Sequence, residues 1–373
     1  MAEIARNYLM KKFCKIPVLL LHFYIGILII GCDQEPLFWD AANAIPPIEP
    51  LIKGHPGQIA ENTAASTLYS CNSDAVWQWE YDAVNSPVWV KMPKQPGGKP
   101  KDPAFAGNNL FVLDWDGIIW KWDGVDWDNS ITAGEGTVEK IFGAGTYLFA
   151  GVKKGGTGSA TGYSVLSMNA ASGTVMTSIL DDTGLLMGAA YSGAVYYLGI
   201  LGDGVYSTGN PAGILSNKEA YESNVIGLAY NGALYVVSRN QIQGSDGTSV
   251  MGAFSGAIAV WTNGVDRLLL AGLLRGSGSY GYGYREIILP AGSGHKIPGS
   301  SAPTSVQENA SISAIGKQVI THLHVMRNPG AVSPAADSDN NPIIIASTQK
   351  NGLWSYRTRN GNAQWNGEDN SGF

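Results

Sequence analysis

Short apolar runs, most of them preceded by turn residues, recur along most of the chain. Seven runs stand out by their aliphatic and aromatic content: Leu68-Tyr69, Leu110-Phe111-Val112, Leu148-Phe149-Ala150, Val195-Tyr196-Tyr197, Leu234-Tyr235-Val236, Leu268-Leu269-Leu270 and Ile343-Ile344-Ile345. Their starts lie 42, 38, 47, 39, 34 and 75 residues apart. Because each run is short and most follow Gly, Asn or Asp, the pattern predicts buried strands; a helix would need about ten residues or more.

A second element with the form aliphatic-Trp-x-aromatic follows several of these runs. It occurs at Val76-Trp77-Gln78-Trp79, Ile119-Trp120-Lys121-Trp122 and Leu353-Trp354-Ser355-Tyr356, with weaker copies at Tyr163–Met168 and Val205-Tyr206. Positions i and i+2 of a strand lie on one face, so the two aromatic side chains of each copy are expected to point the same way. A further Trp comes later in three units, at positions 89, 127 and 365, and indicates an outer strand.

Each unit is therefore predicted to hold four strands in about 40 residues, which is the unit of a β-propeller. We expect an all-β propeller over residues 66–373 with seven four-stranded blades, and six or eight blades are the alternatives. The 75-residue interval is the exception. It is explained either by insertions at Ala291–Ser305 and Arg327–Pro342, in and around the last blade, or by an eighth blade near Ile320–Met326.

The first 31 residues have the pattern of a secretory signal peptide. Three lysines, at positions 11, 12 and 15, precede the nearly unbroken apolar stretch 16–31, which is short for a membrane-spanning helix. The stretch ends in Leu28-Ile29-Ile30-Gly31-Cys32, which resembles the lipobox of bacterial lipoproteins, although Ile30 is bulkier than the usual residue. The resemblance implies cleavage before Cys32 and acylation of its thiol, for example with palmitate. An uncleaved anchor or a buried first helix is the alternative, and translation could start at Met1 or Met10.

Residues 32–65 are predicted to form a tether between the lipid and the propeller. They carry prolines at positions 36, 46, 47, 50 and 56, and proline-rich segments act as extended, semi-rigid spacers. The expected location is the cell envelope, lipid-anchored through Cys32, with the periplasmic or surface leaflet left open.

The propeller repeats and the lipobox together resemble the bacterial β-propeller lipoproteins. The last unit carries the sharpest match: Ile345-Ala346-Ser347-Thr348-Gln349-Lys350-Asn351-Gly352-Leu353-Trp354 is similar to the blade consensus aliphatic-Ala-x-Thr-x-x-x-Gly-Leu-Trp of such proteins. The resemblance implies a fold and a membrane attachment. It implies no particular activity, because propellers host many unrelated functions.

Composition narrows the classes of partner. Charged residues make up 14% of the 373 residues and the net charge is −6, which argues against nucleic acid as a ligand. Gly occurs 48 times, about twice its usual frequency of ~7%, as many tight turns require. After cleavage and acylation, Cys71 would be the only free thiol, so no intrachain disulfide is expected.

Two groups of side chains could bind a metal, but a simpler interpretation is favoured for each. Asp114, Asp116, Asp123, Asp126 and Asp128 could offer oxygen ligands to Ca²⁺, yet their Asp-Gly pairs are typical of hairpin turns. His322 and His324 would share one strand face, but no third ligand lies nearby in the sequence; one of them could instead face the central channel. We therefore predict no metal and no cofactor.

Gly276–Gly281 matches G-x-G-x-x-G, the pattern of dinucleotide-binding loops. The pattern requires a helix after the glycines, but the next residues are predicted to form a loop and a strand, so no nucleotide site is expected.

We expect a non-enzymatic binding or scaffolding protein, because no catalytic motif occurs in the chain. Its partner would be a protein or an envelope glycan. The candidate contact loops, chosen for their length, are 152–161 with Lys153 and Lys154 and 291–305 with His295 and Lys296. The alternative is a carbohydrate-binding or carbohydrate-active envelope protein, which would need exposed Trp faces and paired carboxylates at one mouth.

Overall fold

The computed structural model describes most of the chain from Ile52 to Glu368. The described ranges are 52–65, 67–80, 89–134, 136–155, 162–262, 267–274, 283–298, 315, 318–325, 343–359 and 362–368. The predicted signal peptide, Cys32 and Gly276–Gly281 lie outside them. Within these ranges no helix has the length and apolar character needed to cross a bilayer.

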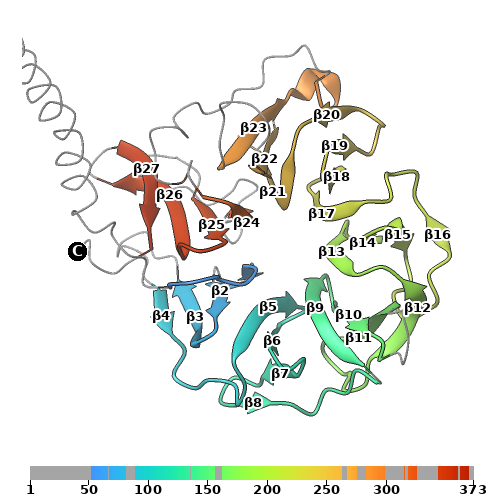
Figure 1. Ribbon diagram of the computed structural model, residues 1–373, viewed down its shortest axis with the longest axis vertical. Coiled ribbons are helices and arrows are strands. Elements are labelled where there is room, and N and C mark those ends of the chain that lie inside the picture. The colour runs from blue at the N-terminus through green and yellow to red at the C-terminus, as the bar shows by residue number, and fades with distance from the viewer. Residues whose placement is uncertain are drawn as a thin grey trace, which may run out of the picture. The chain divides into compact units, whose positions relative to one another are not determined.

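The strands of the described residues form seven antiparallel sheets arranged as the blades of a ring (Figure 1). Blades 1 to 3 contain β1 (Ala60–Asn62), β2 (Thr67–Asn72), β3 (Ala75–Glu80) and β4 (Trp89–Lys91); β5 (Pro100–Ala106), β6 (Asn109–Asp114), β7 (Ile119–Trp122) and β8 (Trp127–Asp128); and β9 (Thr137–Ala144), β10 (Tyr147–Lys153), β11 (Tyr163–Asn169) and β12 (Thr177–Thr183).

The second half of the ring continues in the same order. Blades 4 to 7 contain β13 (Leu186–Tyr191), β14 (Tyr196–Ile200), β15 (Gly204–Thr208) and β16 (Asn217–Lys218); β17 (Val225–Tyr230), β18 (Leu234–Ser238), β19 (Gln241–Gly244) and β20 (Ser249–Met251); β21 (Phe254–Thr262), β22 (Arg267–Leu273) and β23 (Tyr284–Leu289), followed by the short 3-10 helix η1 (Ala291–Ser293); and β24 (Ile320–Val325), β25 (Ile344–Thr348), β26 (Leu353–Arg359) and β27 (Asn362–Gly367).

The repeat found in the sequence corresponds to fixed strands of each blade. All seven apolar runs coincide with the second strand of a blade, and the aromatic elements coincide with third strands. The seven-bladed prediction is confirmed, with one difference: blade 6 has three strands among the described residues. Ile320–Val325 is the inner strand of blade 7, so the proposed eighth blade near this segment is wrong.

The boundary predicted between tether and propeller at residue 66 is also wrong. β1 is the inner strand of blade 1, and the chain before it already contacts blade 7: Leu353 N donates to Ile52 O (3.2 Å) and Gly352 N to Gly54 O (3.0 Å). Ile52 is fully buried against Leu353. The prolines of residues 32–65 suggested a spacer, but backbone pairing with the last blade makes residues 52–65 part of the ring.

Closure of the ring relies on side-chain packing, on these hydrogen bonds and on the one that Ser347 Oγ of β25 donates to Gly57 O (2.8 Å). Blade 1 comes wholly from the start of the described chain and blade 7 wholly from its end, so no strand is exchanged between them. One apolar cluster spans both blades: Ile52, Leu68, Trp79, Trp89, Ile343, Ile345 and Leu353.

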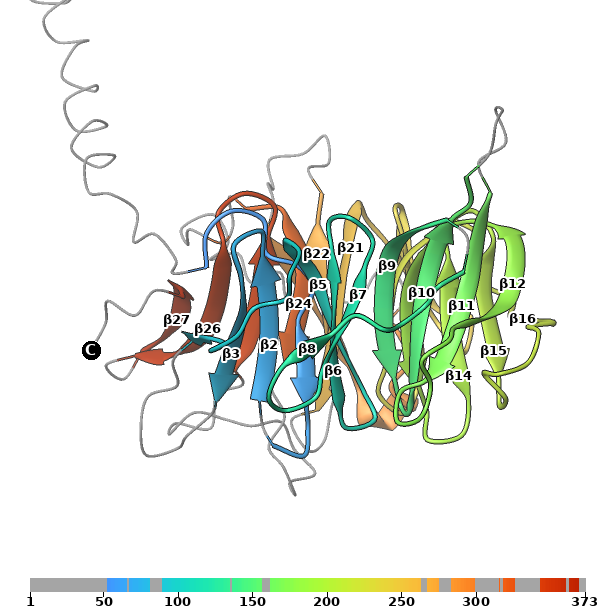
Figure 2. The ribbon, with the colours of Figure 1, turned by 90° about the horizontal axis from the view of Figure 1, so that it is seen from below.

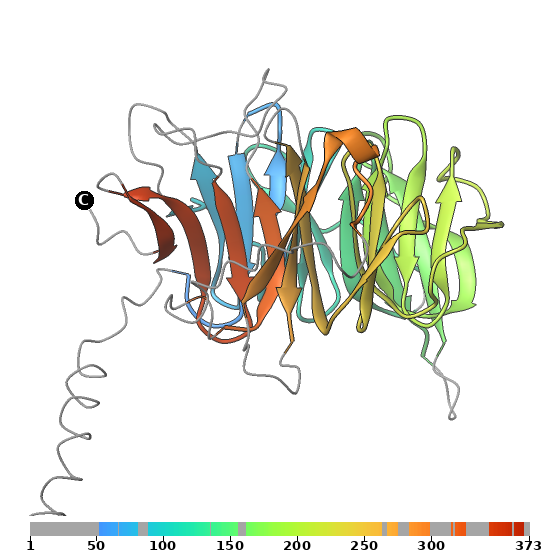
Figure 3. The same cartoon turned by 90° about the horizontal axis from the view of Figure 1, so that it is seen from above.

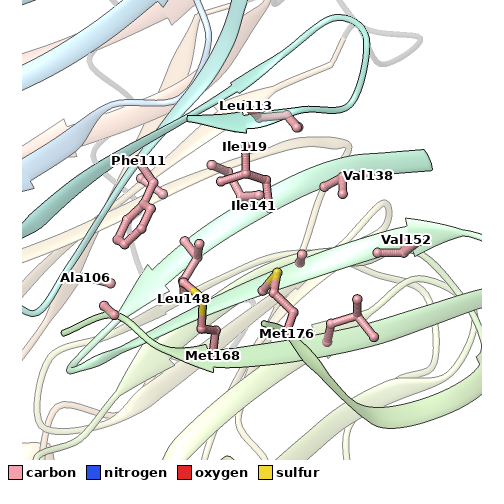
Figure 4. Close-up of a cluster of buried hydrophobic side chains, with 14 residues drawn as sticks. Ala106, Phe111, Leu113, Ile119, Val138, Ile141, Leu148, Val152, Met168 and Met176 are labelled. Atoms are coloured by element: carbon pink, nitrogen blue, oxygen red, sulfur yellow. The ribbon is translucent and has the colours of Figure 1, made fainter. Parts of the chain in front are cut away.

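Similar apolar clusters fill the space between other neighbouring blades. Between blades 2 and 3, Phe111 and Leu113 of β6 face Ile141 of β9 and Leu148 of β10 (Figure 4). Inner strands also approach closely, because a Cβ at Gly143 of β9 would lie 2.0 Å from the Phe105 carbonyl oxygen of β5. Part of the high glycine content therefore serves backbone contact around the axis.

The antiparallel order gives the ring two distinct faces. The linker face carries the connections between blades and the turns between second and third strands, and the hairpin face carries the remaining turns. Figures 2 and 3 show that the end of β10 and η1 lie on opposite faces, the linker face and the hairpin face respectively.

Candidate functional site

A cavity of about 400 Å³ lies at the mouth of the central channel on the linker face. The inner strands β9, β13, β17, β21 and β24 contribute to its walls. Most of the lining is apolar, and Met187, Ile226 and Leu274 are examples. A few polar groups, among them Lys140 and His322, are part of the same lining. Ligand pockets commonly have this composition.

Asp102 is the central charged group beside this mouth. It lies on the inner strand β5 and is 3% exposed. Its Oδ1 accepts a hydrogen bond from Gln58 N (3.2 Å), and its Oδ2 lies 3.3 Å from Lys140 Nζ. Burial alone would raise the pKa of this carboxyl, but Lys140, His322 and the Gln58 N–H outweigh burial and leave the pKa below its ordinary value. The Asp102 carboxylate is therefore charged at neutral pH.

Gln58 connects three blades at this point. Its side-chain Nε2 donates to Pro103 O of β5 (2.6 Å) and to Ile141 O of β9 (2.7 Å). The residue lies in the segment that precedes β1 and is buried. These hydrogen bonds hold the start of blade 1 on the inner strands of blades 2 and 3, and they fix the position of the Asp102 carboxylate.

His322 supplies a neutral ring to the same wall. Burial and the nearby Lys140 lower its pKa to about 3, although Asp102 acts in the opposite direction. Its Nδ1 is buried and has no hydrogen-bond partner among the described residues. Of the 322/324 pair, His322 is the histidine that lines the cavity. His324, two residues further on, lies with its Nε2 3.2 Å from Glu61 Oε2 of blade 1.

The described residues contain no group of three or more His, Cys, Asp or Glu side chains that could hold a metal ion. The aspartates singled out from the sequence lie in turns or at the ends of the adjoining strands. Asp114 is fully buried; its Oδ1 accepts from the backbone N–H of Asp116 and Ile118, and its Oδ2 from Trp120 Nε1 (2.9 Å). Asp123 Oδ1 caps the next turn in the same way, as the hairpin interpretation predicts.

The structure does not bring the two candidate contact loops together. Lys153 is the exposed last residue of β10, and Lys154 forms exposed ion pairs with Asp181 (3.2 Å) and Asp182 (3.1 Å) on the linker face.

His295 and Lys296 follow η1 on the other face. His295 O accepts a hydrogen bond from Tyr235 Oη (2.9 Å), and Lys296 Nζ lies 3.8 Å from Asp246. Because β10 ends on the linker face and η1 lies on the hairpin face (Figure 3), the described parts of the two loops cannot form one surface.

Most of the tryptophans fill the blades, as the strand phase predicts. Trp79 and Trp89 are fully buried and stack on each other, with ring centroids 5.8 Å apart. Trp115 is the exception among the early tryptophans and is 54% exposed. It borders an open groove of about 870 Å³ between blades 1 and 2, together with Asp74 and Asp116.

Cys71, the predicted free thiol, is buried. Its burial and, to a smaller extent, the charge of Asp102 raise the pKa of the thiol.

Sequence reasoning missed Gln58, Asp102 and Lys140. No motif marks them, because they come from three separate segments that meet only when the ring closes. One signal was available: Asp102 lies within Pro100–Ala106, a strand whose other residues are mostly buried. A buried carboxylate needs a partner, so its position in an inner strand pointed to a polar contact.

The chain matches no protein-family model and no curated protein. Solved structures with the same architecture include the WD40 propeller domain of Doa1, with 14% identity and a TM-score of 0.52 over 83% of this chain and 96% of that chain. Sqt1 from Saccharomyces cerevisiae has 12% identity and a TM-score of 0.50 over 84% and 85%. An ancestral GH74 enzyme has 13% identity and a TM-score of 0.56 over 86% of this chain but only 47% of that one. At such identities the likeness concerns the fold alone.

Proposed function

We propose that the chain is a lipid-anchored, non-enzymatic binding or scaffolding module of the bacterial cell envelope. The anchor would be Cys32, at the end of the lipobox-like segment Leu28–Cys32. The body would be the propeller ring, a fold that serves as a binding module in many proteins.

The proposal of a non-enzymatic role is based on the hydrogen bonds and the pKa values of the ionisable groups at the channel mouth. Both oxygens of the Asp102 carboxylate already have partners in the protein, because Oδ2 lies next to Lys140 and Oδ1 accepts a hydrogen bond from the Gln58 N–H. His322, with a pKa of about 3, is a poor proton acceptor near neutral pH, whereas effective general bases have a pKa close to the working pH. A ligand at the channel mouth would therefore meet a shaped, mostly apolar surface and few reactive groups.

The partner would dock on the linker face over this mouth. Leu274 is 37% exposed at its rim, and the cavity behind it is lined by Met187 and Ile226. Apolar side chains surrounded by polar ones are typical of the centre of a protein interface. A protein partner with an apolar side chain at its tip would fit this arrangement.

The test is crosslinking in cells with the native acylated chain, followed by affinity capture and mass spectrometry. Cys32→Ala should move the chain out of the membrane fraction and remove the lipid-dependent partner. Leu274→Asp should abolish capture of that partner, whereas Ile214→Asp, at a site 84% exposed on blade 4, should not. A chain that stays in the membrane fraction and keeps its partners after Cys32→Ala would refute the anchoring.

One observation favours carbohydrate binding as a second candidate function. The exposed Trp115 ring lies in the groove between blades 1 and 2 with the exposed Asp74 and Asp116, and an aromatic face beside carboxylates can stack on and hydrogen-bond a sugar ring. Titration with envelope oligosaccharides tests it: binding should be lost in Trp115→Ala and kept in Tyr191→Ala, which is on another blade. Equal binding by both variants would exclude this groove.

A further inference from the structure

A second cavity, of about 410 Å³, lies between blades 4 and 5, away from the channel. Its aromatic lining is three tyrosines: Tyr197 at the start of β14, Tyr221 in the connection between the blades, and Tyr230 at the end of β17. Turn residues of blade 5 complete the wall, and Glu219 is its charged member.

The three rings form one cluster with exposed surface toward the cavity. Tyr197 and Tyr230 lie nearly parallel, with centroids 6.0 Å apart and planes at 17°, and Tyr221 packs in the same cluster. All three are only partly buried. Tyrosines that only filled the gap between blades would be fully buried, as Trp79 and Trp89 are in blade 1.

Glu219 gives this cavity a negative charge. Its Oε1 accepts hydrogen bonds from Ser207 Oγ and from Asn217 Nδ2. Neutral groups therefore hold the carboxylate, and no cation of the described residues pairs with it. Burial raises the pKa of Tyr221 to about 12, and the charges of Glu219 and Asp246 act in the same direction. Glu219 and Asp246 therefore place negative charge near the rings.

The cations nearest to this cavity have other partners. Lys218 Nζ lies 2.7 Å from Asp203 Oδ1, and Lys296 lies 3.8 Å from Asp246. Arg267 lies beside Gly232, and its guanidinium charge acts to lower the pKa of the Tyr235 hydroxyl, against the larger effect of burial. Neutralising the cavity with a cation from the chain would break one of these contacts, whereas an external cation would not.

The geometry points to a quaternary ammonium group as the ligand of this cavity. Cations are attracted to the electron-rich faces of aromatic rings, and alkylated ammonium groups are bound in this way by clusters of such rings. A quaternary ammonium has no N–H to donate, so ring faces and one carboxylate can hold it, whereas a primary ammonium donates up to three hydrogen bonds and Glu219 is the single carboxylate of the described lining. The site is distinct from the channel mouth and does not depend on the proposed anchoring or partner.

The test is a calorimetric titration of the full chain with choline and with its uncharged isostere 3,3-dimethylbutan-1-ol. We expect choline to bind with a dissociation constant of about 1 mM or tighter, and the isostere to bind about tenfold more weakly. Tyr197→Leu and Glu219→Gln should each weaken choline binding by about fivefold to tenfold. Tyr197→Phe keeps the ring and should stay within about threefold of the wild type. Tyr191→Leu removes an exposed tyrosine outside the cavity and is the matched control.

Several outcomes would overturn the assignment: no heat with choline at about 10 mM, equal affinity for the isostere, or unchanged binding in both Tyr197→Leu and Glu219→Gln. If Tyr197→Leu loses its near-ultraviolet circular dichroism, the variant is misfolded, and the choline affinity of Glu219→Gln alone then tests the assignment.

Vesicles distinguish the source of the ligand. Sedimentation of the chain with phosphocholine vesicles, reversed by free choline and absent with phosphoglycerol vesicles, would assign the ligand to a lipid head group. Binding of free choline alone would assign it to a soluble molecule.

Discussion

His324 of the last blade lies with its Nε2 3.2 Å from Glu61 Oε2 of the first blade. The two side chains are mostly buried, with 20% and 9% of their surface exposed. The two atoms approach each other without hydrogen-bond geometry, across a junction that no shared strand of the described residues closes. The junction where the two chain ends meet is therefore expected to be the weakest point of the ring.

A double-mutant cycle measures this link. His324→Ala and Glu61→Ala should each lower the free energy of unfolding, and their coupling energy should be about 0.5–1.5 kcal/mol, above that of exposed pairs. Urea denaturation of the four chains provides the values. A coupling energy of zero would mean that the contact does not contribute to closure.

The segment before β1 should matter more than its proline content suggests. Ile52 is fully buried, packs in the cluster shared by blades 1 and 7, and its carbonyl accepts from Leu353 N. Ile52→Ala should therefore cost about 2–4 kcal/mol of stability, as deletion of a buried aliphatic side chain does. Ile214→Ala, at a site that is 84% exposed, should change stability by less than about 0.5 kcal/mol. Thermal and urea unfolding would show the contrast.

His322 should make the protein less stable as the pH falls. Its pKa is about 3 in the folded chain and about 6.5 when unfolded. Between these values the unfolded chain binds a proton that the folded chain does not, so stability declines with falling pH, by at most about 1.4 kcal/mol per pH unit.

The effect is measured as the difference between the wild type and His322→Gln between about pH 6 and pH 4.5, because Glu286, whose pKa burial raises, contributes to both chains, and Asp102, with its lowered pKa, titrates below this range. His322→Gln should flatten the slope, whereas Ile214→Ala, at a site that is 84% exposed, should retain it. A slope unaffected by His322→Gln would contradict the assignment.

The sequence predicted the blades but could not predict the channel site, and the reason is the range of the interactions. An apolar run such as Leu110–Val112 and the aromatic pair Trp120 and Trp122 show strand and face within a few residues, because side chains alternate along a strand. Blade count and strand order followed from repeating this local pattern.

The Asp102–Lys140 pair, in contrast, depends on the register of two inner strands and on closure of the ring. No periodicity encodes such a contact. The same holds for Gln58, because the prolines of the preceding segment suggested a spacer; only the hydrogen bonds to blades 2 and 3 show that it belongs to the core. Length alone also chose the contact loops, and length does not tell which face a loop occupies.

The glycines of the inner strands provide the last prediction. A Cβ at Gly143 would lie 2.0 Å from the Phe105 carbonyl oxygen of the neighbouring blade, a separation that real Cβ atoms do not show, and the obstacle is backbone. Gly143→Ala would force the inner strands of blades 2 and 3 apart and should cost about 2 kcal/mol or more, since overpacking a fixed contact is destabilising.

Gly292 in η1 is the matched control, because nothing lies within 4 Å of an added Cβ and its φ is not positive. Gly292→Ala should leave stability unchanged or raise it by up to about 1 kcal/mol through the unfolded state. Urea denaturation of both variants tests the argument. Equal stability of Gly143→Ala and the wild type would mean that the inner strands can separate freely, and the channel mouth would then lack the rigid frame that the Asp102–Lys140 pair requires.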